Sequence, residues 1–225
     1  MTAPVELADG LWHWVARHPE WHPGEFGREV GCYAVRTPDA LLLVDPLLPA
    51  DPDPVLGLLD GLAVERVAIL VTIPYHVRSA DDLWCRYRAR ADVTIHGHRA
   101  AAKRLGDDRA FREVEPGARL PGGAVAHAIG RPRRYEMPLY LPSHHALAFG
   151  DALVVTPSGQ LRVWATSPVD GARRRWYRER FVPTLEPLAG LGIERVLVTH
   201  GTPIAAGGGD ALRAAMAADP WYHRG

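Results

Sequence analysis

The chain has 225 residues, of which 47% are hydrophobic, and its 26 basic residues (Lys and Arg) equal its 26 acidic residues (Asp and Glu) in number. This length can bury a substantial core, so we expect residues 1–225 to form a single domain. The balanced charge gives no reason to expect nucleic acid or a membrane surface as a partner. The longest apolar runs are only as long as a strand, and the N-terminus lacks the basic and apolar regions of a signal peptide. We therefore expect a cytoplasmic protein.

Short apolar runs bounded by turn residues predict strands along most of the chain. These runs lie at 10–15, 31–36, 41–45, 67–72, 93–96, 124–129, 137–141, 146–149, 153–156 and 196–199. Helices are predicted at 53–62, 98–105, 171–190 and 209–218. A further helix should begin at Ser79, which forms a near capping box with Asp82. The order of these elements favours an α+β fold, a four-layer αββα sandwich in which helices cover two sheets from outside.

Residues 61–74 and 190–203 nearly repeat each other, and both contain a Glu-Arg pair before an apolar strand. Each copy is predicted to form the end of a helix, a turn and a strand that is buried on both faces. We expect the two strands to end on the same side of the molecule. Active sites of layered α/β proteins collect at such strand ends. The histidines that follow the two strands, His76 and His200, are therefore candidates for a site.

A second pair of similar segments, 40–45 and 146–151, consists of apolar strands that end in Asp45 and Asp151. A single Asp in this position is typical of a turn residue. Because His200 also follows an apolar strand, a functional role for Asp151 is favoured. We expect Asp151 and His200 to lie close together in the central cleft.

These segments together resemble the metallo-β-lactamase superfamily over nearly the whole chain. The resemblance rests on the N-terminal hairpin, on 41–45, on 69–72 with the loop and helix that follow, on 147–151 and on 198–201. In that family an Asp after a Gly bridges two metal ions, and a His-Gly pair near the C-terminus supplies the last ligand. Asp151 and His200 correspond to these two positions. The resemblance implies the αββα sandwich of metallo-β-lactamase type.

The first metal-binding motif of that family, His-x-His-x-Asp-His, is degraded in this chain. Its four ligand positions fall on Ile73, Tyr75, Val77 and Arg78, and the position of the third histidine upstream of the Asp strand falls on Arg131. Isoleucine and valine cannot bind zinc, so we expect no dinuclear zinc site. The remaining donors lead us to expect no cofactor, or at most one divalent metal ion (zinc) held by His76, Asp151 and His200.

Arginine at these positions would place positive charge where the family binds metal. In a metal-free site Arg78 is expected to pair with Asp151 or with a bound anion, because a buried arginine needs a partner. Tyr75 and Arg131 are expected to join Arg78 in binding a ligand.

Two functions follow from the resemblance to the family and from the missing metal ligands. The first is a diverged protein of hydrolase ancestry that acts on or binds a small anionic molecule in the central cleft, with Asp151, His200 and His76 as its acid and base groups. The alternative is a mononuclear metal-dependent hydrolase of esters or thioesters that uses the same three residues. A protein partner in the cleft and a homodimer are both compatible with the sequence.

Aromatic and imidazole residues are concentrated near the N-terminus. In the resembling family the loop after the first hairpin strand overhangs the active site, which implies a flap with Trp14, Trp21 and His22 facing the ligand. The other interpretation is that these side chains close the end of the sandwich or form a dimer contact. The pair His96 and His98 is expected to be structural.

Overall fold

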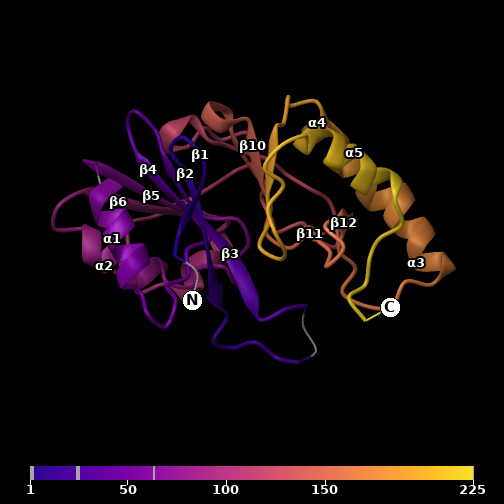
Figure 1. Cartoon of the computed structure of the whole chain (residues 1–225), viewed down its shortest axis with the longest axis horizontal. Helices are drawn as coiled ribbons and strands as arrows, with labels where there is room; N and C mark the ends of the chain where they lie inside the picture. The colour runs from indigo at the N-terminus through magenta and orange to yellow at the C-terminus, as the bar shows by residue number, and fades with distance from the viewer. Residues whose placement is uncertain (1–2, 24–25, 63, 225) are drawn as a thin grey trace.

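Figure 1 shows the computed structural model, which describes residues 3–23, 26–62 and 64–224. The first sheet contains β1 (Val5–Ala8), β2 (Leu11–Arg17), β3 (Glu29–Arg36), β4 (Leu41–Val44), β5 (Arg66–Val71), β6 (Asp92–Gly97) and β7 (Phe111–Glu113). The second sheet contains β8 (Val125–Ala126), β9 (Leu139–Leu141), β10 (Ala146–Ala148) and β13 (Arg195–Leu197), and a two-stranded sheet contains β11 (Leu153–Val155) and β12 (Leu161–Val163). The α-helices are α1 (Asp53–Leu62), α2 (Ala80–Tyr87), α3 (Gly171–Trp176), α4 (Glu186–Ala189) and α5 (Gly208–Ala217).

The strands of the first sheet lie side by side in chain order. β1 to β4 pair antiparallel through short connections, whereas β4 to β7 pair parallel. Parallel neighbours need a crossover connection, and α1 and α2 supply it between β4, β5 and β6. The carboxyl ends of β4 and β5 therefore meet at one edge of the sheet, and so do the residues that follow them.

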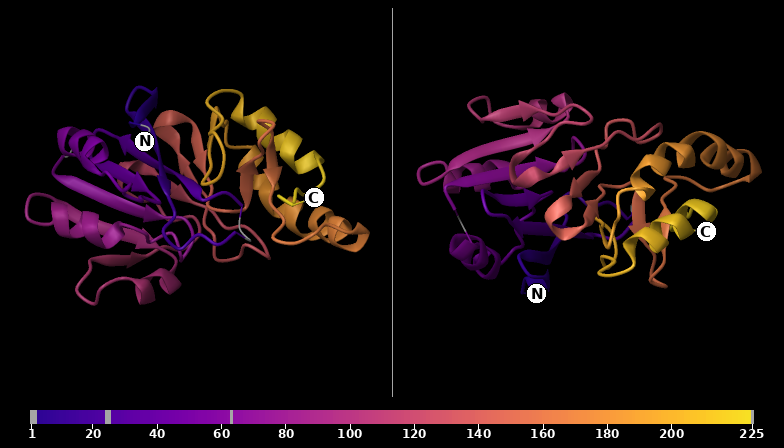
Figure 2. Two further views of the ribbon diagram at one scale, coloured as in Figure 1. Left: turned by 60° about the horizontal axis from the view of Figure 1, so that its bottom comes forward. Right: turned by 90° about the horizontal axis from the view of Figure 1, so that it is seen from above.

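Three clusters of buried hydrophobic residues separate four layers. The first lies between α1, α2 and the seven-stranded sheet, and the second between the two large sheets. The third lies between the second sheet, the two-stranded sheet and the helical residues of 177–185, α4 and α5. Side chains of a strand alternate between its two faces, so Leu41 and Leu43 join the first cluster and Leu42 and Val44 the second. This arrangement, which Figures 1 and 2 show, confirms the predicted sandwich.

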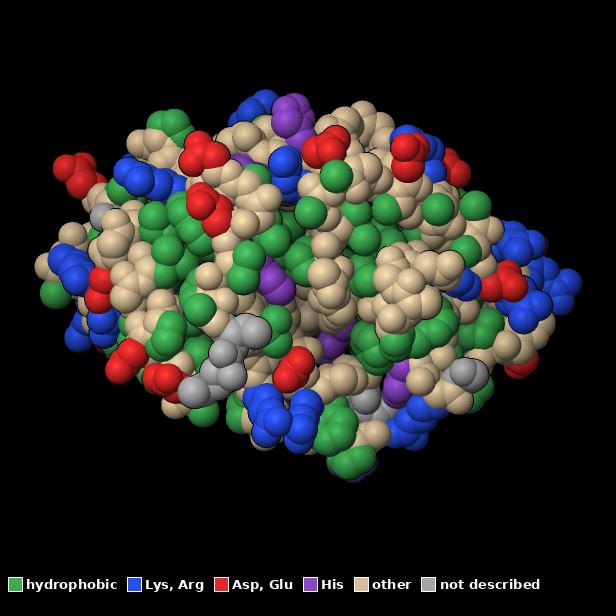
Figure 3. Space-filling model, in the orientation of Figure 1, with side chains coloured by type: hydrophobic (Ala, Val, Ile, Leu, Met, Phe, Trp, Pro, Cys, Tyr) green, Lys and Arg blue, Asp and Glu red, His purple; other side chains and the backbone are tan. Residues whose placement is uncertain are grey.

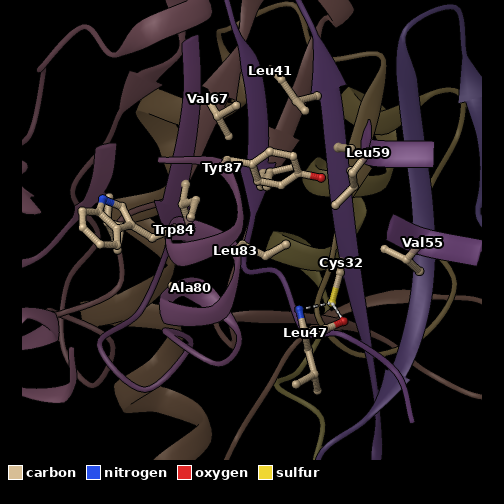
Figure 4. Packing of buried hydrophobic residues seen from close by; sticks show 14 of the residues in the cluster. Cys32, Leu41, Leu47, Val55, Leu59, Val67, Ala80, Leu83, Trp84 and Tyr87 are labelled. Carbon is tan, nitrogen blue, oxygen red and sulfur yellow. Dashed lines mark hydrogen bonds between the residues drawn. The ribbon is translucent and has the colours of Figure 1, made fainter. Parts of the chain in front are cut away.

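Figure 4 shows the first cluster from close by, with Val55 and Leu59 of α1 and Leu83 of α2 packed near the strands. The thiol of Cys32 lies in this cluster, and its Sγ atom accepts a hydrogen bond from the backbone N–H of Leu47 at 3.2 Å. Burial raises the pKa of the Cys32 thiol to about 11. Cys32 is therefore protonated and acts as a small apolar residue of the core.

Several predicted elements differ in detail. The helix expected over 171–190 is broken into α3, a π-helical turn at Tyr177–Phe181, a 3₁₀ turn at Val182–Leu185 and α4. Prolines lie at the first or second position of the last two pieces, where they are tolerated. The helix predicted at 98–105 is a 3₁₀ helix, Arg99–Arg104.

The predicted cap of α2 is wrong, although the helix begins where expected. Ser79 makes no side-chain cap, because its Oγ atom accepts a hydrogen bond from Leu48 N at 2.9 Å. The strand expected at 124–129 is reduced to β8.

Lys and Arg side chains gather at the end of the molecule that carries α3 (Figure 3). Arg174 and Arg178 both form ion pairs with Asp219 at 3.0 Å, so part of this charge is neutralised locally. Within the described residues, no helix combines the length and the apolar character that a membrane crossing requires.

Candidate functional site

Four polar residues that follow strands come together between the two large sheets. Asp45 follows β4, His76 lies in the loop after β5, Asp151 follows β10, and His200 follows β13. The Oδ1 atom of Asp151 lies 3.5 Å from His76 Nε2 and 3.8 Å from His200 Nε2. The expectation that the strands β5 and β13 end on the same side is therefore confirmed, as is the expected proximity of Asp151 and His200.

Asp45 fixes the orientation of His76. The carboxylate of Asp45 is buried and accepts hydrogen bonds from the backbone N–H and the hydroxyl of Thr72, and its Oδ2 atom lies 2.9 Å from His76 Nδ1. Because Nδ1 is used in this contact, the other ring nitrogen of His76 faces Asp151. The backbone of Asp45 has φ of 46°, a left-handed conformation that Asp tolerates better than most residues.

Asp151 is buried, with 12% of its side chain exposed. Burial alone would raise the pKa of its carboxyl, but electrostatic interaction with His76 and Arg133, with smaller contributions from His200 and Arg78, holds that pKa below its ordinary value. Asp151 is therefore ionised near neutral pH.

Arg133 forms an ion pair with Asp151. Its Nη1 atom lies 3.8 Å from Asp151 Oδ2, and its guanidinium lies over the ring of Trp164, 5.0 Å from the ring centroid. The predicted pairing of Arg78 with Asp151 is wrong, because Arg78 donates instead to the carbonyl oxygen of Asp45 at 2.8 Å. The prediction that Arg131 binds in the cleft is not supported either, since Arg131 is exposed to solvent.

His200 lies in an aromatic environment. The ring centroids of Phe26 and Trp164 lie 5.4 Å and 5.7 Å from that of His200. Desolvation by this burial lowers the pKa of His200 to about 4, so its imidazole is neutral at pH 7.

Glu136 binds the backbone on which Asp151 lies. It is 1% exposed, and its two carboxyl oxygens accept hydrogen bonds from the backbone N–H groups of Gly150 at 2.9 Å and Asp151 at 3.0 Å. Burial raises the pKa of Glu136 to about 8, a shift that the charge of Arg133 and hydrogen bonds from the backbone reduce. Sequence reasoning missed this residue.

The aromatic flap is only partly present. The prediction for Trp14 is wrong, because this side chain is 1% exposed in the core and its Nε1 donates to the Leu47 carbonyl oxygen at 2.9 Å. Trp21 is half-buried and His22 is exposed, and the ring of their loop that contacts His200 is Phe26. Trp14 is instead part of the first core cluster.

Three further residues have clear positions. Tyr75 is 51% exposed, and its ring centroid lies 6.3 Å from that of His76 in an edge-on arrangement. His96 Nε2 lies 2.8 Å from the hydroxyl of Thr94, and His98 Nδ1 accepts a hydrogen bond from Ala100 N at the start of a 3₁₀ helix. Both histidines are thus structural, as expected.

The donor set does not suit a metal ion. Among the residues that the structure describes, no group of three or more His, Cys, Asp or Glu side chains is arranged to hold one. Arg133 already lies beside the Asp151 carboxylate, and a second cation a few ångströms away would be repelled in this poorly solvated cleft. Two metal ions would also lack ligands, because Ile73 and Val77 offer no donor atoms.

The fold is shared with many solved structures. The chain is 17% identical to a metallo-β-lactamase family protein from Thermus thermophilus, with a TM-score of 0.60 over 94% of this chain and 78% of that one. It is 14% identical to the metallo-β-lactamase FIM-1 from Pseudomonas aeruginosa, solved in its mono-zinc form, with a TM-score of 0.61 over 95% and 94% of the two chains. The rubredoxin oxygen:oxidoreductase from Desulfovibrio gigas gives 16% identity and a TM-score of 0.65 over 95% of this chain and 60% of that one. No protein-family model matches the sequence, and no curated protein does.

Proposed function

This chain has the metallo-β-lactamase fold, and we propose that it binds a small anionic molecule in its central cleft without a metal centre. The cleft is the region around Asp151 where His76, His200, Arg133 and Arg78 approach one another. In this proposal the fold is inherited from a hydrolase, and arginine charge has replaced the charge of the metal.

The observation that carries the proposal is a set of buried N–H groups that lack partners. The Nε and Nη2 atoms of both Arg78 and Arg133, and Nε1 of Trp164, are buried and make no hydrogen bond within the described part of the chain. An unpaired buried donor costs about 1–3 kcal/mol, and more when it is charged. These groups therefore favour an acceptor that comes from outside, and carboxylate or phosphate oxygens are the acceptors that guanidinium groups bind best.

Within the described residues, the carboxylates of the site do not pair with these N–H groups. The carboxylate of Asp45 contacts Thr72 and His76. The Nη1 atom of Arg78 donates to the backbone carbonyl of Asp45 at 2.8 Å and to the Sγ atom of Cys32 at 3.9 Å. Asp151 lies 3.8 Å from Arg133, beyond hydrogen-bond distance, and so compensates that charge only partly.

Hydrolysis by general-base catalysis is supported less well than binding. A general base works best when its pKa lies near the pH at which it acts. The pKa of His200 is lowered to about 4, and that of Asp151 lies below its ordinary value. Both groups are weak bases at pH 7, so binding is the activity that we infer.

Isothermal titration of the protein with inorganic phosphate, before and after chelator treatment, tests the proposal. Arg133→Ala should weaken phosphate binding at least tenfold, which corresponds to about 1.4 kcal/mol. Arg131→Ala is the matched control, because Arg131 is exposed two residues away, and it should leave the affinity unchanged. Equal affinities in the two variants, or binding that chelator treatment abolishes, would contradict the proposal.

A further inference from the structure

A second cavity, of about 490 Å³, lies outside the central cleft. It is lined by Pro74, Tyr75, Ala100, Lys103, Arg104 and Tyr135. None of these residues takes part in the contacts around Asp151. The volume is within the range of natural small-molecule sites, and the proposed anion site does not account for it.

Two tyrosine rings form the aromatic part of this cavity. Tyr75 is 51% exposed and Tyr135 is 45% exposed, which makes them two of the few large hydrophobic side chains on the surface of the described chain. Exposed aromatic rings that line a cavity offer stacking surface to a planar ligand. Stacking of a nucleic-acid base on an aromatic side chain contributes about 1–3 kcal/mol.

The charged part of the cavity is entirely basic. Lys103 and Arg104 line it, and within the described residues neither has a carboxylate oxygen within 4.0 Å. The guanidinium carbon of Arg104 lies 5.6 Å from the centroid of the Tyr75 ring, and that of Arg134 lies 4.6 Å from the centroid of Tyr135. A guanidinium group thus lies over each of the two rings. The acidic side chains Glu113 and Glu115 line a separate cavity of about 380 Å³.

The geometry points to a second ligand site in this cavity, one that binds a nucleoside monophosphate. The base lies against the rings of Tyr75 and Tyr135, and the phosphate pairs with Lys103 and Arg104. Guanidinium and ammonium groups both bind phosphate oxygens strongly. This site shares no residue with the anion site around Asp151, although the ring centroid of Tyr75 lies 6.3 Å from that of His76.

Titration calorimetry with adenosine 5′-monophosphate tests the inference, with adenosine and inorganic phosphate as partial ligands. The monophosphate should bind at least tenfold more tightly than adenosine. Tyr135→Ala, and separately the double variant Lys103→Ala with Arg104→Ala, should each weaken it at least tenfold. All of these side chains are exposed, so the variants should fold, and circular dichroism checks this.

Two controls separate this site from others. Trp176→Ala removes an exposed ring on α3 and should leave the affinity for the monophosphate unchanged. Arg133→Ala should also leave it unchanged, whereas it should weaken inorganic phosphate at the central cleft. Absence of monophosphate binding at millimolar concentration overturns the inference. Loss of that binding in Arg133→Ala but not in the cavity variants also overturns it, because the nucleotide would then occupy the central cleft.

Discussion

Glu136 holds the backbone of Asp151 in place. Its Oε2 atom accepts a hydrogen bond from Asp151 N at 3.0 Å, and its Oε1 atom accepts one from Gly150 N at 2.9 Å. The position of the Asp151 carboxylate between His76, His200 and Arg133 therefore depends on a residue that does not face the cleft.

We expect Glu136→Gln to lower the free energy of unfolding by about 1–3 kcal/mol, because an amide nitrogen cannot accept one of the two backbone hydrogen bonds. Urea unfolding monitored by circular dichroism measures this change. Glu115→Gln, at an exposed position, should change the stability by less than about 0.5 kcal/mol. If the two variants are equally stable, the buried carboxyl does not support Asp151 in the way described.

Stability should reach its maximum near pH 6.5. Burial lowers the pKa values of His13, His96 and His200 to about 4, so between pH 4 and 6.5 the unfolded state binds more protons and stability rises with pH. Burial raises the pKa of Glu136 from 4.5 to about 8. Between these two pH values the folded state retains a proton that the unfolded state has lost, so stability falls as pH rises. The three histidines outweigh Glu136 below pH 6.5, and Glu136 acts alone above it.

One such group changes stability by about 1.4 kcal/mol per pH unit, so the loss between pH 6.5 and 8 should be about 2 kcal/mol. Thermal unfolding measured from pH 4 to 9 provides the profile. In Glu136→Gln the decline above pH 6.5 should disappear. A decline that persists in this variant would assign it to another group.

The Asp45 carboxylate should be one of the most sensitive positions in the protein. Asp45→Asn keeps the size of the side chain and tolerates the left-handed backbone, but it removes the charge that Thr72 and His76 contact. We expect a loss of about 3–5 kcal/mol in the free energy of unfolding. Asp92→Asn serves as the control, because the side chain of Asp92 is 70% exposed. Its free energy of unfolding in urea should be close to that of the unchanged protein. A loss in Asp45→Asn no larger than in this control would mean that the buried carboxylate is not needed.

The fold could be predicted because the hydrophobic pattern of the strands and the order of strands and helices along the chain determine the arrangement of the layers. Strands such as β4 and β5 are apolar on both faces, and only a strand covered on both sides needs that pattern. The proximity of Asp151 and His200 followed from the same reasoning, since each residue comes directly after a buried strand.

The cation of the site could not be identified in the same way. Arg131, Arg133 and Arg134 lie within four consecutive residues, and nothing local distinguishes the one that turns inward. Packing against Trp164, which is distant in sequence, decides it. Glu136 gave no signal either, because a single Glu before an apolar run is more typical of a surface position than of a buried one.

The measurement that tests the central claim most directly is the metal content of the protein. Protein purified without chelators, incubated with excess zinc and then freed of unbound metal, is submitted to elemental analysis. Because Arg133 lies beside Asp151 and the first ligand motif is degraded, we expect well below one zinc ion per chain. A stoichiometry close to one or two, lost on treatment with a chelator, would show that His76, Asp151 and His200 form a metal centre and would contradict the metal-free site.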